Sequence, residues 1–152
     1  MTTTTEAVAG ITTLSATEMA EQIASGALSS SEVVEAHIRR IEEVNPRLNA
    51  LVVPLFEQAR KEAAAADVSR SRGEALGPLH GVPITIKESF DVRGTPTTMG
   101  LSARVNLRAE SDGPIVARLR VAGAIILGKT NVPQMVIYNE ADNPVYGRTN
   151  NP

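Results

Sequence analysis

Residues 82–87 read VPITIK, an apolar run that ends in a lysine. The side chains of a strand alternate between its two faces, so the two isoleucines would share one face while the threonine and Lys87 share the other. A second run, AIIL at residues 124–127, is apolar throughout, which is expected of a strand buried on both faces. The two runs therefore predict two strands of a sheet.

A helix is expected between these two runs. Asp112 is suited to be its N-cap, the Gly-Pro pair at residues 113–114 would open its first turn, and Gly123 would close it. The side chains expected to face inward are Ile115, Val116 and Leu119. The strand–helix–strand order predicts an α/β fold with a mixed β-sheet core flanked by helices.

Two capped helices are expected near the N-terminus. Ser15 and Glu18 have capping-box spacing, and Ser29 and Glu32 repeat it. The second of these helices would end at residues 45–46, an Asn-Pro pair, because proline disfavours a helical residue before it. The side chains that it would bury are Val34, Ile38 and Ile41.

One more strand and one more helix are expected before the VPITIK run. Residues 51–53 read LVV and predict a short strand, and a helix would follow over about residues 55–70. That helix presents a face of small residues suited to close packing, made of Ala59, Ala63 and Ala66.

The composition limits the classes of function that fit this sequence. The chain has 152 residues, 42% hydrophobic and 21% charged, and a formal net charge of -2. There is no basic excess to attract nucleic acid or an anionic membrane. The chain has no cysteine, which excludes disulfides and fits a reducing compartment. With no secretory signal and no apolar run of about 20 residues, we expect a cytoplasmic protein that does not span a membrane.

Residues 123–130 read GAIILGKT and match the phosphate-binding pattern G-x-x-x-x-G-K-T. The pattern binds phosphate only where a strand precedes the first glycine and a helix begins near the lysine. Here a helix is expected before Gly123, and the four apolar residues are themselves the strand. Pro133 leaves little room for a helix that starts at Lys129. We therefore predict that this match is accidental.

Lys87 is the candidate for chemistry. A lysine among apolar neighbours loses hydration, so its pKa falls, and the neutral amine can then take a proton from a hydroxyl. The alternative is a solvated lysine at the end of a strand, paired with Glu88. The spacing alone favours this alternative, because most lysines are exposed.

Four segments carry a resemblance to a known family. Residues 81–102 resemble the lysine-bearing segment of the amidase-signature family, and residues 128–135 (GKTNVPQM) are similar to its next shared segment. Residues 143–152 (NPVYGRTNNP) resemble the stretch that leads into the family's Gly/Ser-rich signature, and residues 14–53 are similar to its usual start. Each motif is weak alone, but four of them in the family's order are specific.

The resemblance implies the amidase-signature fold and an amide hydrolase that uses two serines, one with a cis peptide bond, and a lysine. On this basis Lys87 is the catalytic base, the substrate is a small-molecule linear carboxamide, and no cofactor or metal is needed. The resemblance also places Met135, in the apolar stretch 135–138, at the border of an acyl-binding channel, with plain core packing as the alternative. Thr97 and Thr98 would help to shape the site, although a tight turn also favours such residues.

The remaining candidate residues have structural interpretations. His80 lies in a Gly/Pro turn and His37 in an expected helix, and two histidines far apart without cysteine do not predict a metal site. The serines at residues 29–31 are explained by helix capping.

The resemblance covers only the N-terminal part of the family's domain. Residues 1–13 are predicted to be a flexible lead and residues 14–152 the N-terminal portion of a single amidase-signature domain, because no segment resembles the loop that carries the two serines. We therefore expect the chain to be inactive alone. Its sheet would need the remaining part of the domain or another chain to cover it, and a homodimer is one such arrangement.

Two alternatives to an amide hydrolase stay open. Within the family, the chain could belong to the A subunit of a glutamyl-tRNA amidotransferase, which transfers ammonia in a complex. From another class, it could be a non-catalytic binding or assembly module, since nothing in it completes an active site.

Overall fold

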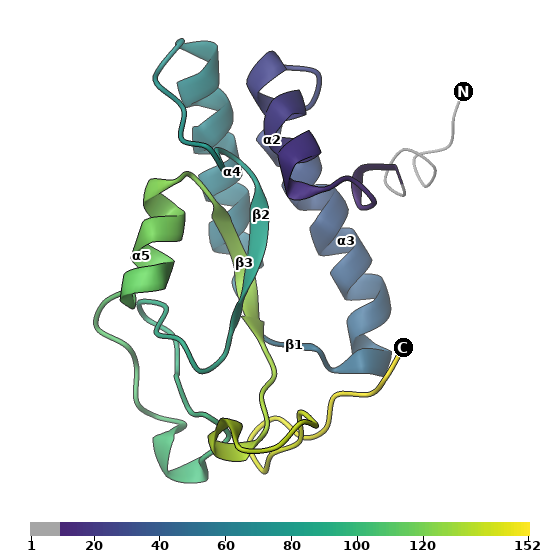
Figure 1. Ribbon diagram of the computed structural model, residues 1–152, viewed down its shortest axis with the longest axis vertical. Coiled ribbons are helices and arrows are strands. Elements are labelled where there is room, and N and C mark those ends of the chain that lie inside the picture. The colour runs from purple at the N-terminus through teal and green to yellow at the C-terminus, as the bar shows by residue number, and fades with distance from the viewer. Residues whose placement is uncertain (1–9) are drawn as a thin grey trace. The chain divides into compact units, whose positions relative to one another are not determined.

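Strand β3 lies at the centre of the sheet. A computed structural model describes residues 10–152, and within them a three-stranded sheet has the order β1–β3–β2 (Figure 1). The strands are Leu51–Pro54 (β1), Pro83–Lys87 (β2) and Ile125–Thr130 (β3). The helices are Ala16–Ser25 (α2), Ser30–Leu48 (α3), Phe56–Ser71 (α4) and Pro114–Val121 (α5), with short 3-10 turns at Ser102–Arg104 (η1) and Gln134–Val136 (η2).

The sheet is mixed, as predicted. β1 is antiparallel to β3, with Leu51 opposite Thr130. β2 runs parallel to β3: the amide of Ile125 donates to Val82 O at 2.9 Å, and further along both strands the amide of Glu88 donates to Thr130 O at 2.9 Å. The first five residues of β3 are buried, which confirms the expectation drawn from its unbroken apolar start.

The chain forms two compact units. The first comprises Met1–Glu42, Leu55–Ile84 and Leu119–Leu127, and the second comprises Glu43–Pro54, Thr85–Arg118 and Gly128–Pro152. Strands β2 and β3 each begin in the first unit and end in the second. Lys87 and Lys129, which lie at or near the ends of these strands, therefore both belong to the second unit.

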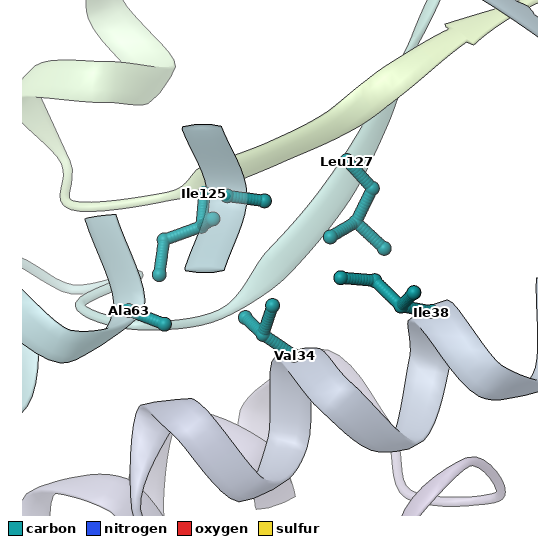
Figure 2. Close-up of a cluster of buried hydrophobic side chains, with 6 residues drawn as sticks. Val34, Ile38, Ala63, Ile125 and Leu127 are labelled. Atoms are coloured by element: carbon teal, nitrogen blue, oxygen red, sulfur yellow. The ribbon is translucent and has the colours of Figure 1, made fainter. Parts of the chain in front are cut away.

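The core of the first unit lies where α3 and α4 pack on the start of β3. Val34 and Ile38 of α3 point toward Ile125 and Leu127 of β3, with Ala63 of α4 beside them (Figure 2). Burial of each large aliphatic side chain contributes about 1.5–3 kcal/mol. The small-residue face predicted for α4 is confirmed, since its alanines let the helix approach closely. The buried members of the cluster are Val34, Ile38, Ala59, Ala63, Ile125 and Leu127.

The N-terminal cap of α2 has the predicted geometry. The Glu18 amide donates to Ser15 Oγ at 3.2 Å, and the Ser15 amide donates to Glu18 Oε2 at 2.7 Å. The helix buries Met19 and Ile23 in a second apolar cluster, on which Ile11 also packs. Most of the predicted N-terminal lead, residues 1–9, lies outside the described residues.

The predicted end of α3 is wrong. The helix continues through Pro46 to Leu48, and Asn49 then takes a left-handed φ of 53°, as a helix C-terminus commonly does. The side chain of Asn45 organises the turn that follows, since its Oδ1 accepts the amides of Ala50 and Leu51 at 2.9 and 2.8 Å. These bonds to the turn just after the helix hold its last turn helical and outweigh the conformational preference of the residue before proline.

The predicted inward face of α5 is partly wrong. Val116 is fully buried, but Ile115 is 55% exposed. Successive residues of a helix point about 100° apart, so a helix of 8 residues that buries Val116 turns its neighbour away. Asp112 Oδ1 accepts the Arg93 amide at 2.7 Å, a contact between loops that the capping pattern did not indicate.

Asp67 of α4 holds the start of α3. Its carboxylate accepts the amides of Ser30 and Ser31 at 2.7 and 3.0 Å and the Ser31 hydroxyl at 2.6 Å. Burial raises the pKa of Asp67, but these hydrogen bonds lower it by more, so that its pKa lies below the usual range. The predicted capping pair of Ser29 and Glu32 is present as well.

We predict that Asp67→Ala lowers the free energy of unfolding by about 1–2 kcal/mol at neutral pH, as loss of a helix cap does. The pKa of Asp67 is lower in the folded chain than in the unfolded chain. The loss should therefore be largest above about pH 4 and shrink at lower pH as the carboxylate is protonated. Urea unfolding of both proteins across this range measures the difference. Glu74→Ala, at an exposed carboxylate, is the control and should change stability by less than about 0.5 kcal/mol.

Candidate active site

Lys87 is the last residue of β2, and its side chain is exposed. The predicted alternation is confirmed, because Ile86 is buried at 5% exposure whereas Thr85 and Lys87 are exposed. The described residues therefore present the Lys87 amine to solvent and do not surround it with apolar groups.

Glu88, the next residue, is fully buried. Its Oε1 accepts the Thr98 amide at 2.6 Å and the Tyr146 hydroxyl at 3.2 Å, and its Oε2 accepts the Met99 amide at 2.9 Å. Two successive amides directed at one carboxylate form an anion-binding nest. Glu88, the expected surface partner of Lys87, is thus buried and binds the loop of residues 96–99 instead.

Lys129, near the end of β3, is also fully buried. Its Nζ donates to Pro96 O at 2.5 Å and to Thr97 Oγ1 at 3.0 Å. Burial lowers the pKa of Lys129 to about 8, against the opposing effect of the carboxylates of Glu88 and Asp91. The burial expected for Lys87 is therefore found at Lys129, although the amine of Lys129 has polar partners.

The phosphate-binding interpretation of residues 123–130 is excluded by this geometry. Gly128 and Lys129 both lie within β3, so no helix begins at the lysine. The Lys129 amine points at Pro96 and Thr97, where it is fully buried and has no room for a phosphate.

Loop 96–99 is therefore held from two sides. Lys129 binds it at Pro96 and Thr97, and Glu88 binds it at Thr98 and Met99. Thr97 and Thr98 are buried. Both threonines expected to shape the site thus take part in fixing this loop.

Asn143 fixes the segment that brings Tyr146 to Glu88. It is buried, and its Nδ2 donates to Asn131 Oδ1 at 2.9 Å and to Val132 O at 2.8 Å. Its Oδ1 accepts the amides of Val145 and Tyr146 at 2.9 and 2.8 Å. One side-chain amide thereby uses all its hydrogen-bonding capacity to shape a turn.

Met135 lies in η2 on a surface segment of the second unit. Its φ of 55° and the φ of 61° at Val136 are both left-handed. Met135, Ile137 and Tyr138 are 54%, 66% and 72% exposed, so the described residues do not bury this apolar stretch. A hollow of about 560 Å³ is lined by the same segment, through Gln134, Tyr138, Asn139, Glu140, Asp142, Asn143 and Pro144.

The two histidines have structural partners. His80 Nε2 donates to Ala66 O at 2.9 Å, and His37 Nδ1 donates to Val33 O at 2.8 Å. Across residues 10–152, the structure shows no group of three or more His, Cys, Asp or Glu side chains placed to hold a metal ion. The first unit therefore uses both imidazoles for packing.

Comparisons with known proteins place this arrangement in a family. The amidase family model matches residues 32–152. The chain is 51% identical over 138 residues to an indoleacetamide hydrolase of Bradyrhizobium diazoefficiens, covering 91% of this chain and 26% of that protein. It is 41% identical over 139 residues to the A subunit of a glutamyl-tRNA(Gln) amidotransferase of Streptomyces coelicolor, covering 91% and 28%.

Solved structures agree with these matches. The fold matches a fatty acid amide hydrolase with a TM-score of 0.91 at 32% identity, covering 95% of this chain and 26% of that one. It matches a bacterial aryl acylamidase of the amidase signature family with a TM-score of 0.83 at 33% identity, covering 91% and 29%. The chain belongs to the amidase-signature family of amide hydrolases, as the four sequence segments predicted. It spans about a quarter of the length of the curated relatives it matches.

None of the helices in the described part of the chain combines the length and the apolar character that a bilayer crossing requires.

We predict that the cost of burying the Lys129 charge can be measured as a pH dependence of stability. The pKa of Lys129 is about 8 in the folded chain and has its ordinary value near 10.5 in the unfolded chain. The unfolded state therefore binds more protons between these values, and stability rises with pH through this window. Lys129→Met removes the effect, so the free energy of unfolding of the wild type minus that of the variant should increase from about pH 8 to about pH 10. A difference that stays flat or falls in urea unfolding would contradict this assignment.

Proposed function

We propose that this chain supplies the base of an amide hydrolase, and that Lys87 is that base. The observation that carries the proposal is the exposed side chain of Lys87, which directly precedes Glu88 in the sequence, the residue whose buried carboxylate fixes the neighbouring loop. An amine presented in this way is accessible to a hydroxyl from a segment outside the described residues, whereas the fully buried amine of Lys129 is not.

The proposed reaction runs through two serines. The Lys87 amine takes a proton from one serine, whose peptide bond is cis, and that serine takes the proton of the second. The second serine attacks the carbonyl carbon of a linear carboxamide, the amine leaves with a proton, and an acyl-enzyme forms. Water then hydrolyses the ester and releases the carboxylate. Lys87 thereby follows the serine–lysine variant of the catalytic triad.

Met135 is proposed to contact the acyl part of the substrate. It is exposed and lies in the second unit together with Lys87. A carboxamide with an apolar acyl group would gain from this contact, because exposed apolar surface is buried on binding. The names of the relatives are consistent with such substrates, as indoleacetamide hydrolase and fatty acid amide hydrolase both denote amides with apolar acyl groups.

We predict that a chimera restores the complete reaction. This chain would replace the corresponding segment of the Bradyrhizobium indoleacetamide hydrolase, to which it is 51% identical. The chimera should hydrolyse indoleacetamide, and Lys87→Ala should lower kcat by about 10²–10⁴-fold, the usual contribution of a general base. Lys61→Ala, at an exposed lysine of α4, is the matched control and should leave kcat unchanged. Full activity of the Lys87→Ala chimera would refute the assignment.

The 152-residue chain alone is proposed to have no amidase activity, since neither serine of the reaction has been identified in it. Hydrolysis of indoleacetamide by the purified chain, abolished by Lys87→Ala, would refute this. A chimera that folds and never acquires activity would favour the non-catalytic binding or assembly module instead.

We also propose that the exposed apolar side chains of the chain are covered by another polypeptide, either the remainder of an amidase domain or a second copy. Ile137 and Tyr138 of the second unit are 66% and 72% exposed, and exposed apolar groups in one segment mark interaction surfaces. The chain alone should therefore self-associate in light scattering at micromolar concentration, and Ile137→Glu should reduce the association. Ala65→Glu, on the exposed face of α4, should not, and a clean monomer would exclude self-association.

Membership of a glutamyl-tRNA(Gln) amidotransferase, as part of its A subunit, is the second candidate function. It is favoured by the 41% identity to the corresponding protein of Streptomyces coelicolor. Substituted into that protein instead, this segment should support amide transfer in the assembled complex if it belongs to this class. Activity of the hydrolase chimera alone would favour the hydrolase.

A further inference from the structure

Met99, whose amide binds the buried Glu88 carboxylate, has an unfavourable backbone conformation. The φ of Met99 is 48°, in the left-handed region that costs a side-chain-bearing residue about 1–2 kcal/mol. In this conformation the amides of Thr98 and Met99 both point at the carboxylate of Glu88, at 2.6 and 2.9 Å. The buried carboxylate needs these donors, because an unsatisfied buried charge costs more than the strained backbone.

Met99 is joined in turn to Met135. The Met135 amide donates to Met99 O at 2.8 Å. Met135 and Val136 both have left-handed φ values, 55° and 61°, and a β-branched residue such as valine is rarely found there. Strained backbone of this kind persists only where surrounding contacts enforce it.

The two strained segments also pack directly on each other. A Cβ atom at Gly100 would lie 3.1 Å from the Cα of Gln134 and 2.5 Å from the Cβ of Asn143. Gly100 itself has a φ of 71°. The loop after Met99 therefore approaches the Met135 segment more closely than any side chain at position 100 would allow.

Lys129 binds the same loop but makes no hydrogen bond to Met99, the residue that binds Met135. Its bonds end at Pro96 and Thr97, whereas the bond to Met135 starts from Met99. The hydrogen-bonded connection from the Glu88 carboxylate to the Met135 amide therefore runs through Met99.

We propose that Glu88 is a positioning residue that sets the backbone of Met135 through Met99, and so holds the acyl-contacting segment in register with Lys87. The inference rests on the proposed function, because that proposal assigns Lys87 and Met135 to the reaction. Lys87 and Glu88 are adjacent in sequence and would have different roles. Lys87 carries the exposed amine, and Glu88 fixes the surface on which the acyl group would lie.

Amide hydrogen exchange in the 152-residue chain tests the link without any requirement for activity. Glu88→Gln should speed exchange at least tenfold at Thr98, Met99 and Met135. The Asn131 amide, which donates to Ala50 O in the same unit at 2.8 Å, should exchange as in the wild type. Glu110→Gln, at an exposed carboxylate of this unit, should change none of these amides.

A rescue separates positioning from a general loss of stability. Glycine adopts left-handed φ without the steric cost of a side chain, so Met99→Gly added to Glu88→Gln should slow exchange at Met135 at least threefold relative to Glu88→Gln alone. If Met135 exchanges at the wild-type rate in Glu88→Gln while Thr98 and Met99 exchange fast, the inference is wrong. No rescue by the glycine would also overturn it.

A milder variant decides the matter if Glu88→Gln does not fold. Tyr146→Phe keeps the carboxylate and removes one hydrogen bond to it, of 3.2 Å. It should speed exchange at Met99 and Met135 together by at least twofold. Unchanged exchange at Met135 would then overturn the inference.

Kinetics of the chimera test the role toward substrate. Glu88→Gln should raise the KM for indoleacetamide at least fivefold, and Met99→Gly should partly restore it. An unchanged KM would overturn the substrate-positioning role even if the exchange pattern holds. The Lys87→Ala chimera tests the proposed function separately, so the two failures are distinguishable.

Discussion

The second unit depends on the burial of two opposite charges, Glu88 and Lys129, which are both fully buried. Removing an ion from water costs several kcal/mol unless its hydrogen-bonding groups are satisfied. Here the backbone and one side chain of a single loop, residues 96–99, supply most of the partners of both groups. The conformation of that loop is therefore set by charge satisfaction and not by apolar packing, and this accounts for the left-handed Met99 within it.

The two units are stabilised in different ways. The first is held by aliphatic side chains of α3, α4 and the start of β3 (Figure 2), which tolerate substitutions of similar volume. The second is held by directional bonds, such as the four made by Asn143; aspartate has the same shape but supplies neither of the two donors. Geometry fixed by hydrogen bonds suits the proposed site, which would hold the Lys87 amine and the Met135 surface at a set separation, since preorganisation of this kind requires rigid support.

Elements set by a short sequence pattern could be predicted from the sequence, and elements set by particular side-chain hydrogen bonds could not. The capping box of Ser15 and the buried start of β3 follow from local pattern, and both were predicted correctly. The end of α3 was not, because Asn45 acts on residues beyond the proline. For the candidate site, Lys87 was proposed from the family resemblance, whereas the role of Lys129 could not be predicted because its partners lie 33 and 32 residues away in the chain. A lysine that follows apolar residues in a strand, as Lys129 does, is only weak evidence of burial. The sequence pattern around it suggested phosphate binding instead.

The contrast between the two lysines clarifies what the base requires. A lysine side chain can accept a proton only when its amine is neutral, and burial against apolar groups favours the neutral amine. Lys129 has the burial, but two of its protons are donated to Pro96 and Thr97, and its fully buried amine leaves no room for a substrate hydroxyl. Lys87 has the access and lacks the burial. Its proposed role therefore requires that groups outside the described residues cover the amine when the serines approach it. Lys129 therefore loses its hydrating water when the chain folds. Lys87, the proposed base, would lose it only when the segments that carry the serines cover its amine.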